Sequence, residues 1–300
     1  MWPFTEERRP ALRRTNWLIA TGCAAAVVAT ATLVVLWRAA GDDASPVGVS
    51  GSASATPGAP SPAFTGQPGD EPPVTADAGA REAEVLLASA SPRAVRYSFD
   101  AGPGRSVLDL GGQHALRTVT ALGGTVSFVR RGDGYAARFP ARCHAPDSQC
   151  ARAILETTGA DAFNSGTRPM RYGAAVLMTA ADTAAGANVL QKGFSVGGGT
   201  QYKLQVDGRA GKPSCVLARG ATIYRLVGPV GIADGRWHRV ACTRAGGWLS
   251  INVDGVAVSR QVPAGLSIDN DQPLRIGGKN AAPGNDQYAG QIDDVFVSIY

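Results

Sequence analysis

A Gly-x-Ser-x-Gly motif occupies residues 193–197, within the segment KGFSVGGG. In many serine hydrolases this motif carries the nucleophile at a sharp turn between a strand and a helix. His238 with Asp207 or Asp234 would complete a triad in a workable chain order. Three consecutive glycines start a helix poorly, however, and the TQYKLQV that follows alternates at the period of a strand. We therefore expect Ser195 to lie in a hairpin loop, without a catalytic role.

A second kind of catalysis, glycoside hydrolysis, generally needs two carboxylates that flank the scissile bond. From residue 93 to the C-terminus the chain holds a single glutamate, Glu156, and no aspartate pair has a recognisable catalytic context. We therefore expect a protein that is not an enzyme.

Cysteine chemistry is the third possibility. Four of the five cysteines lie in the C-terminal region, at Cys143, Cys150, Cys215 and Cys242. In an exported protein an even number predicts disulfides, and four cysteines allow three pairings. The first two would close the short loop CHAPDSQC, and the last two lie in strand-like runs that could be neighbouring strands. The alternative is a metal site formed by Cys143, His144 and Cys150, but no second Cys/His cluster lies nearby in the sequence.

The N-terminal region predicts a membrane anchor. Residues 17–37, WLIATGCAAAVVATATLVVLW, form a stretch of 21 residues without a charge. As a helix this stretch would span about 32 Å, close to the thickness of a bilayer core. Arginines within residues 1–16 predict a cytoplasmic N-terminus, followed by a single-pass transmembrane signal anchor at 17–38. The alternatives are a signal peptide cleaved near residues 39–41 and, less favoured by the sequence, lipidation at Cys23.

Residues 39–92 are expected to be a disordered linker. Between residues 41 and 92, 36 of 52 residues are Ala, Gly, Pro, Ser or Thr, and a short helix at 81–90 is possible but not required. The linker should therefore tether an exported domain, residues 93–300, to the outside of the cell membrane.

The exported domain shows short alternating runs separated by turn residues, which is typical of an all-β fold. The clearest is WLSINVDGVAVSR at 248–260, where Asp254 and Gly255 suit a two-residue hairpin turn. Further strands are expected at 95–100, 125–130, 135–139, 172–179, 201–206 and 237–244. So many short strands predict a two-sheet antiparallel sandwich or jelly roll.

Three segments resemble the LamG-like jelly-roll domains of the concanavalin A-like lectin/glucanase superfamily. They are YSFDAGPGRSVLDLGGQHAL at 97–116, GRWHRVACTRAGGWLSINVDG at 235–255 and GQIDDVFVSIY at 290–300. The resemblance implies two packed antiparallel sheets, adjacent first and last strands, and binding of carbohydrate or protein. It also implies a calcium site, for which Asp100 and Asp293 are the candidate ligands, with Asp109 and Asp294 as secondary ones. The alternative is that Asp100 and Asp109 accept backbone hydrogen bonds in turns.

The expected function is non-catalytic binding of a cell-wall or surface glycan, with a surface protein as the alternative partner. Aromatic rings could stack on sugars, and the candidates are Tyr172, Tyr202, Tyr224, Trp248 and Tyr288, whereas Trp237 is assigned to the core. Residues 93–300 carry 23 Lys plus Arg against 15 Asp plus Glu, a net of +8, which would attract acidic polymers. Nucleic acid is excluded as a partner because the domain is exported and its arginines are scattered.

Overall fold

The computed structural model describes residues 78–88 and 92–300, all within one compact unit that spans 69–300. The expected cytoplasmic segment, the transmembrane anchor at 17–38 and most of the linker lie outside the described residues. Among the residues that are described, no helix is long and apolar enough to span a bilayer.

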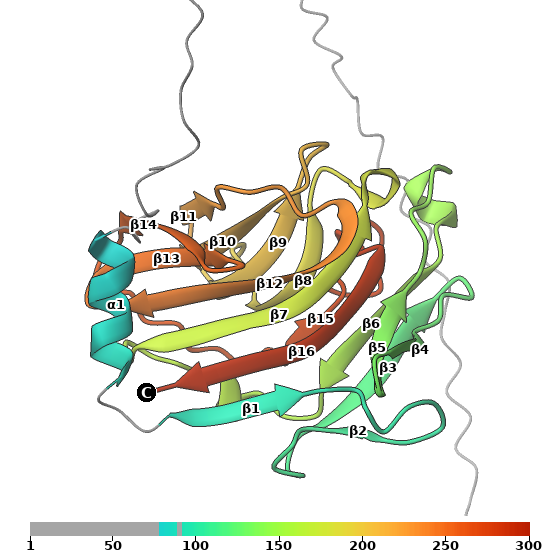
Figure 1. Cartoon of the computed structure of the whole chain (residues 1–300), viewed down its shortest axis with the longest axis horizontal. Helices are drawn as coiled ribbons and strands as arrows, with labels where there is room; N and C mark the ends of the chain where they lie inside the picture. The colour runs from blue at the N-terminus through green and yellow to red at the C-terminus, as the bar shows by residue number, and fades with distance from the viewer. Residues whose placement is uncertain (1–77, 89–91) are drawn as a thin grey trace, which may run out of the picture. The chain divides into compact units, whose positions relative to one another are not determined.

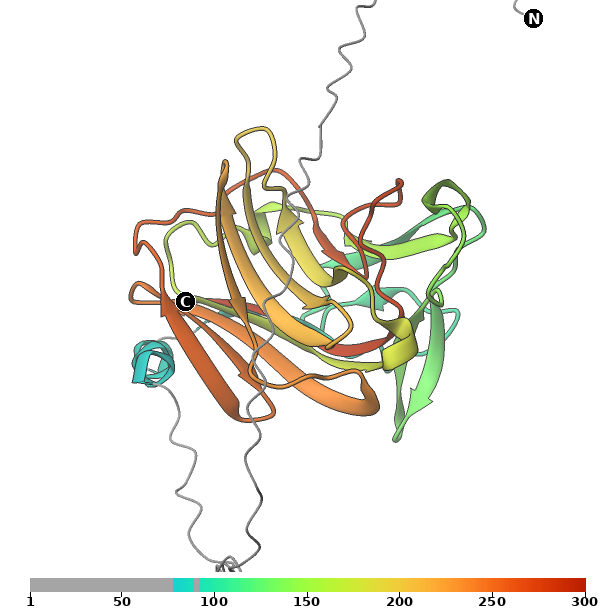
Figure 2. The ribbon, with the colours of Figure 1, turned by 90° about the horizontal axis from the view of Figure 1, so that it is seen from above.

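The described chain forms two eight-stranded antiparallel sheets packed face to face, which confirms the expected sandwich (Figures 1 and 2). Sheet A has the strand order β14-β13-β12-β7-β16-β5-β4, with β1 paired to β16. Its strands are β1 (Arg93–Tyr97), β4 (Ser127–Arg131), β5 (Gly134–Phe139), β7 (Met170–Thr179), β12 (Asp234–Ala245), β13 (Trp248–Val253), β14 (Val256–Gln261) and β16 (Gly290–Ile299).

Sheet B has the strand order β11-β10-β9-β8-β15-β6-β3-β2. Its strands are β2 (Val107–Leu108), β3 (Ala115–Ala121), β6 (Arg152–Thr157), β8 (Ala187–Gly193), β9 (Thr200–Asp207), β10 (Lys212–Arg219), β11 (Thr222–Val227) and β15 (Leu274–Ile276). Three short 3₁₀ helices, Asp147–Gln149, Asp161–Phe163 and Ala180–Asp182, lie in the connections.

Two expectations about local structure are confirmed. The first and last strands are adjacent, since β1 pairs antiparallel with β16 along five residues. The hairpin between β13 and β14 turns at Asp254 and Gly255, whose φ angles of 51° and 96° are those that a two-residue turn requires.

The core lies between the sheets and is filled by one alternating set of residues from each strand. Tyr202, Leu204 and Val206 of β9, for example, are buried in the main cluster, whereas the residues between them face outward. A disulfide between Cys215 and Cys242 crosses this core. It joins β10 of sheet B to β12 of sheet A, so the expected pairing is right but the two strands face each other across the sandwich rather than lying side by side. The second disulfide, Cys143–Cys150, closes the short loop as expected.

Residues Ala78–Ala88 form helix α1, which overlaps the short helix that the sequence allowed at 81–90 within the expected linker. The helix packs on the outer face of sheet A near the ends of β12, β13 and β14 (Figure 1). Ala83 and Leu87 are buried against Ala245, with Tyr300 beside them. Helices this short are marginal in isolation, so docking on the sheet accounts for its formation.

Candidate functional site

Ser195 lies in the loop between β8 and β9, which pair as an antiparallel hairpin. A strand, not a helix, follows the glycines, so the expected hairpin loop is confirmed. The two ring nitrogens of His238 both bind carboxylates, at 2.6 Å from Asp254 and 2.9 Å from Asp234. Asp207 instead contacts Ser214 and Arg225. The candidate triad is therefore not assembled.

His238 has a structural setting instead. Burial disfavours its charged form, but hydrogen bonds from the ring to Asp234 and Asp254 outweigh this effect and raise its pKa. Asp254 also accepts the backbone N–H of Arg239 at 2.7 Å, so the three side chains tie the β13–β14 turn to β12.

The aromatic candidates do not form a sugar-stacking surface. Tyr172, Tyr202 and Tyr288 are fully buried in the core. Trp248 is only partly exposed and is covered by α1, where Gly79 lies against the indole ring and the indole N–H donates to Glu82 at 2.9 Å. Four of the five candidates are therefore core or helix-packing residues, and Tyr224 is half-buried near the sheet edge.

Trp237 was assigned to the core but lies on the outer face of sheet A. His238, Val240 and Cys242 are buried, and strand alternation turns Trp237 outward. The guanidinium of Arg131 stacks 4.1 Å from the centre of its ring.

Three of the calcium candidates, Asp100, Asp293 and Asp294, contact the β4–β5 hairpin, but their carboxylate oxygens bind protein groups. Arg131 forms ion pairs with Asp293 and, at 3.0 Å, with Asp294. Asp100 is exposed and accepts the backbone N–H of Tyr135 at 3.2 Å. Burial raises the pKa of Asp293, although Arg131 opposes this effect. A guanidinium thus lies where a cation would bind.

Asp109, a secondary calcium candidate, also has a turn role. It accepts backbone N–H bonds from Gly111, Gln113 and His114 at 3.0, 2.7 and 2.6 Å. Burial opposes its ionisation, but these bonds prevail and lower its pKa. Within residues 78–88 and 92–300 no three His, Cys, Asp or Glu residues are placed to hold a metal ion. The residues present therefore do not fit a calcium ion.

The outer face of sheet B presents a row of seven residues, six of which are polar. Strand registers align one residue from each of seven neighbouring strands, and each alternates with core residues of its own strand. We call these residues the sheet B row: Arg117, Glu156, Arg275, Gln191, Lys203, Val216 and Arg225.

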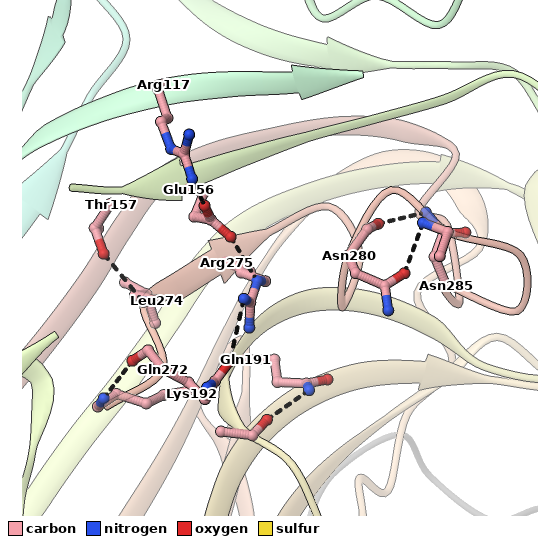
Figure 3. Close-up of polar contacts among 12 residues, drawn as sticks. Arg117, Glu156, Thr157, Gln191, Lys192, Gln272, Leu274, Arg275, Asn280 and Asn285 are labelled. Carbon is pink, nitrogen blue, oxygen red and sulfur yellow. Dashed lines mark hydrogen bonds and ion pairs between the residues drawn. The ribbon is translucent and has the colours of Figure 1, made fainter. Parts of the chain in front are cut away.

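Glu156, the single glutamate of residues 93–300, is at the centre of the ionic part of this row. Its carboxylate binds Arg117 at 2.5 Å on one side and Arg275 at 2.7 Å on the other (Figure 3). Its side chain is nearly buried, and both carboxylate oxygens are therefore occupied by guanidinium groups.

Side chains at the two ends of the row are exposed to solvent, whereas a side chain near its middle is buried. Side-chain exposure is 65% at Arg117 and 47% at Arg225, whereas Gln191 is only 1% exposed. Two buried polar atoms on this face, Nη1 of Arg275 and Oδ1 of Asn188, lack a hydrogen-bond partner in the described structure. Phe194, half-buried, lies with its ring 5.2 Å from the Arg275 guanidinium.

An open depression of about 500 Å³ lies at the Arg117 end of the row. We call it the Arg117 depression; it is lined by Arg117, Glu156, Thr157, Thr158, Gly159, Ala160, Asp271 and Pro273. Its walls therefore offer guanidinium, carboxylate and hydroxyl groups within one concave surface. Sequence reasoning missed it because Arg117 and Glu156 are 39 residues apart, and only the strand register brings them together.

Comparisons with known proteins agree with this architecture. Residues 174–299 match the model of the concanavalin A-like lectin/glucanases superfamily. None of the curated proteins compared matches the chain.

Among the solved structures that match the chain, an arabinanase domain supports the similarity of fold. Domain 4 of AbnA, a GH43 extracellular arabinanase from Geobacillus stearothermophilus, solved with arabinotriose, is 16% identical with a TM-score of 0.52, over 70% of this chain and 94% of that chain. The binding domain of Botulinum neurotoxin DC, solved with SialylT, is 10% identical with a TM-score of 0.48, over 68% of this chain and 47% of that chain. At these identities the likeness concerns the fold alone. The match over residues 174–299 and the two-sheet jelly roll together show that this part of the chain is similar to the concanavalin A-like lectin/glucanases superfamily.

Proposed function

We propose that this domain is a non-catalytic carbohydrate-binding module, held outside the cell by an N-terminal membrane anchor. The observation that carries the proposal is the polar sheet B row that ends in the Arg117 depression. The row lies on the sheet opposite the one that α1 covers, so the helix does not obstruct it.

The groups in the depression suit sugar hydroxyls. Arg117 is largely exposed and keeps N–H donors beyond those bound to Glu156. Thr158 and Asp271 are exposed on the same wall and can donate or accept hydrogen bonds. Phe194, beside Arg275, offers a partly exposed ring against which a sugar face could pack.

The same contacts support a role in binding rather than hydrolysis. A general acid needs a proton that it can give to the leaving group, and a nucleophile needs a free oxygen. Each carboxylate oxygen of Glu156 is bound by a guanidinium group, so neither oxygen is open to a substrate.

The choice of first ligands follows from the arabinanase domain, which was solved in complex with arabinotriose. A neutral oligosaccharide of pentose or hexose units is therefore the ligand class to test first. The proposed location is the cell membrane, with residues 17–38 as a single-pass anchor and the domain extracellular.

A protein partner is the second candidate, and one feature of sheet B favours it. The edge strand β11 and the residues after it expose Ile223, Val227 and Val230 at 55%, 39% and 40%. Edge strands with exposed apolar side chains are surfaces on which another chain can dock.

The glycan proposal is tested by comparing Arg117→Ala with Arg209→Ala in affinity electrophoresis against arabinan and neutral β-glucans. Arg209 is exposed in the β9–β10 turn, so its replacement removes the same charge away from the depression. We expect Arg117→Ala to weaken binding about tenfold, because a hydrogen bond from a charged donor contributes about 1.5–3 kcal/mol. Arg209→Ala should bind as the unaltered chain does.

Equal binding by both variants would contradict a site in the Arg117 depression. Absence of binding by the unaltered chain to every neutral glycan would favour a protein partner at β11. Melting temperatures of both variants should match that of the unaltered chain, since Glu156 keeps Arg275 when Arg117 is replaced.

A further inference from the structure

A second concave surface lies on the outer face of sheet A. It has a volume of about 340 Å³ and is lined by residues of β1, β7, β12, β13 and β16. We call it the sheet A hollow. Its walls carry Arg96, Arg171 and Arg239, and its floor includes Ala175 and Ala241.

Strand register explains why this part of the sheet is hollow. Gly173 of β7 lies between Ala241 on β12 and Phe296 on β16, and Ala175 pairs with Arg239. A Cβ atom at Gly173 would lie 2.2 Å from the carbonyl oxygen of Val240, so the close strand contact requires glycine. Small residues at the centre thus leave space that the long arginine side chains surround.

The charge around the hollow is predominantly positive. No carboxylate in the described part of the chain lies within ion-pair distance of Arg96 or Arg239. Arg171 is 3.6 Å from Glu84 of α1, and its Nε atom is buried without a hydrogen-bond partner.

The two acidic residues at the rim are engaged elsewhere. Asp254 binds His238 and the backbone N–H of Arg239. Asp294 binds Arg131 at 3.0 Å. Neither carboxylate therefore neutralises the exposed guanidinium groups of Arg96 and Arg239.

The wall also has an apolar part. Phe296 is partly exposed and its ring lies against Gly173, at 3.0 Å from the position of a Cβ atom there. Together with Ala175 and Ala241 it offers an apolar patch next to the arginines. Such a combination suits a ligand that carries an oxyanion beside the face of a ring.

We propose that the sheet A hollow binds the oxyanion of an acidic polysaccharide, with Arg96 and Arg239 pairing the anion and Phe296 contacting the sugar ring. The site is separate from the Arg117 depression, and it rests on the proposed function only in that a glycan carries the anion. The two sites lie on opposite sheets, so each can be abolished without the other.

The probes are polygalacturonate, its fully methyl-esterified form, and inorganic polyphosphate. The esterified polymer has the same sugar without the charge, and polyphosphate has the charge without the sugar. We expect the full chain to bind polygalacturonate at physiological salt at least tenfold more tightly than the ester. Polyphosphate should bind more weakly than polygalacturonate, because it lacks a ring for Phe296. Equal binding to polygalacturonate and its ester, or tighter binding to polyphosphate, would overturn the proposal.

Two variants test the location. Arg96→Gln with Arg239→Gln removes both unpaired charges, and Ala241→Phe fills the hollow but leaves every charge in place. Each should weaken polygalacturonate binding about tenfold or more. The control Arg209→Gln with Arg236→Gln removes two exposed charges outside the hollow and should change affinity less than twofold.

Unchanged binding by Ala241→Phe, with a melting temperature that shows it folded, would overturn the proposal. An equal loss in the control pair would reduce the interaction to net charge and would also overturn it. Arg117→Ala separates this inference from the proposed function: it should lose neutral glycans and keep polygalacturonate.

Discussion

At the scale of single residues, Lys192 has an unusual setting. It lies on β8 with its side chain directed between the sheets, and it has no exposed surface. Its ammonium group donates to the carbonyl oxygen of Gln272 (Figure 3). It also donates to the carbonyl oxygen of Asn270 at 2.9 Å and to the Asn270 side chain at 3.2 Å. Lys192 thereby holds the segment that leads into β15.

Burial lowers the pKa of Lys192 from 10.5 to about 8, although nearby aspartates, Asp161 first among them, oppose this effect. Between these two values the unfolded chain binds more protons than the folded chain, so stability should rise with pH. Below pH 8 the Lys192 ammonium is charged in the folded state, and the free energy required to bury that charge lowers the stability of the folded chain.

We therefore predict that the free energy of unfolding increases between about pH 8 and pH 9.5, by roughly 1–2 kcal/mol at most. Chemical denaturation at several pH values measures this slope. The matched variant is Lys192→Met, which cannot titrate and should show a smaller slope. The measurements should stay below pH 10, because burial raises the pKa of Tyr172 and Tyr202. Above pH 10 these tyrosines lose their protons in the unfolded chain before the folded chain, so stability falls as the pH rises. An identical slope in the variant would assign the effect to other groups.

Trp237 shows what the sequence could and could not reveal about single residues. Its strand, WHRVACTR, offers two alternating sets, and the one with Val240 and Cys242 is the more apolar. That set is buried in the structure, so Trp237 faces outward, contrary to the core position that we expected for it. The partner of Trp237, Arg131, is distant in the sequence and no local pattern identifies it.

At the scale of elements, amino-acid composition was a poor guide to helix α1, because it favoured disorder for residues that form a helix. An Ala- and Gly-rich segment lacks enough apolar residues to form a core by itself, but it can still dock on a sheet. Glu82 accepts the indole N–H of Trp248, and Glu84 lies 3.6 Å from Arg171 at the edge of the sheet A hollow. The helix therefore fixes the point where the described chain joins the preceding residues.

Gly79→Val should undock this helix. A Cβ atom at Gly79 would lie 2.4 Å from Ser259 Oγ and 2.6 Å from the Trp248 ring, so a larger side chain cannot fit without movement. We expect a loss of roughly 1–3 kcal/mol of stability, the contribution of burying a side chain such as Leu87. Increased iodide quenching of Trp248 fluorescence should accompany it.

The control for this variant is Ala78→Val, at the exposed neighbouring position. It carries the same new side chain at the same end of the helix and should leave quenching unchanged. Equal quenching in the two variants would contradict docking through Gly79.

At the scale of the whole molecule, the strand pattern was sufficient for the fold class. The β13–β14 hairpin follows from a local signal and the adjacency of β1 and β16 from the resemblance, whereas the cysteines allowed three pairings, of which the structure shows Cys143–Cys150 with Cys215–Cys242. The sheet B row did not follow, because it depends on the register of seven strands. Arg275, for example, is 119 residues from Glu156, and a shift of one residue in one strand would turn it into the core.

The aromatic residues show why the sequence did not locate a ligand site. An aromatic in an alternating strand can face the core or the solvent, and Tyr172 and Tyr202 belong to the set that fills the core. The polar residues beside them are the ones that reach the outer faces. The two concave surfaces on the outer faces are therefore lined by arginines, carboxylates and small residues, and neither contains a tyrosine.

The central claim is that the domain binds carbohydrate and does not cleave it. Titration calorimetry of the full chain, in detergent and with its disulfides formed, against arabinotriose and neutral β-glucan oligosaccharides tests it most directly. Chromatography of the recovered sugar reports cleavage in the same experiment. We predict saturable binding that persists at about 0.5 M salt, where exposed charge interactions are largely screened, and sugar recovered intact. Shortened oligosaccharides, or no heat of binding to any neutral glycan at any salt concentration, would contradict the claim.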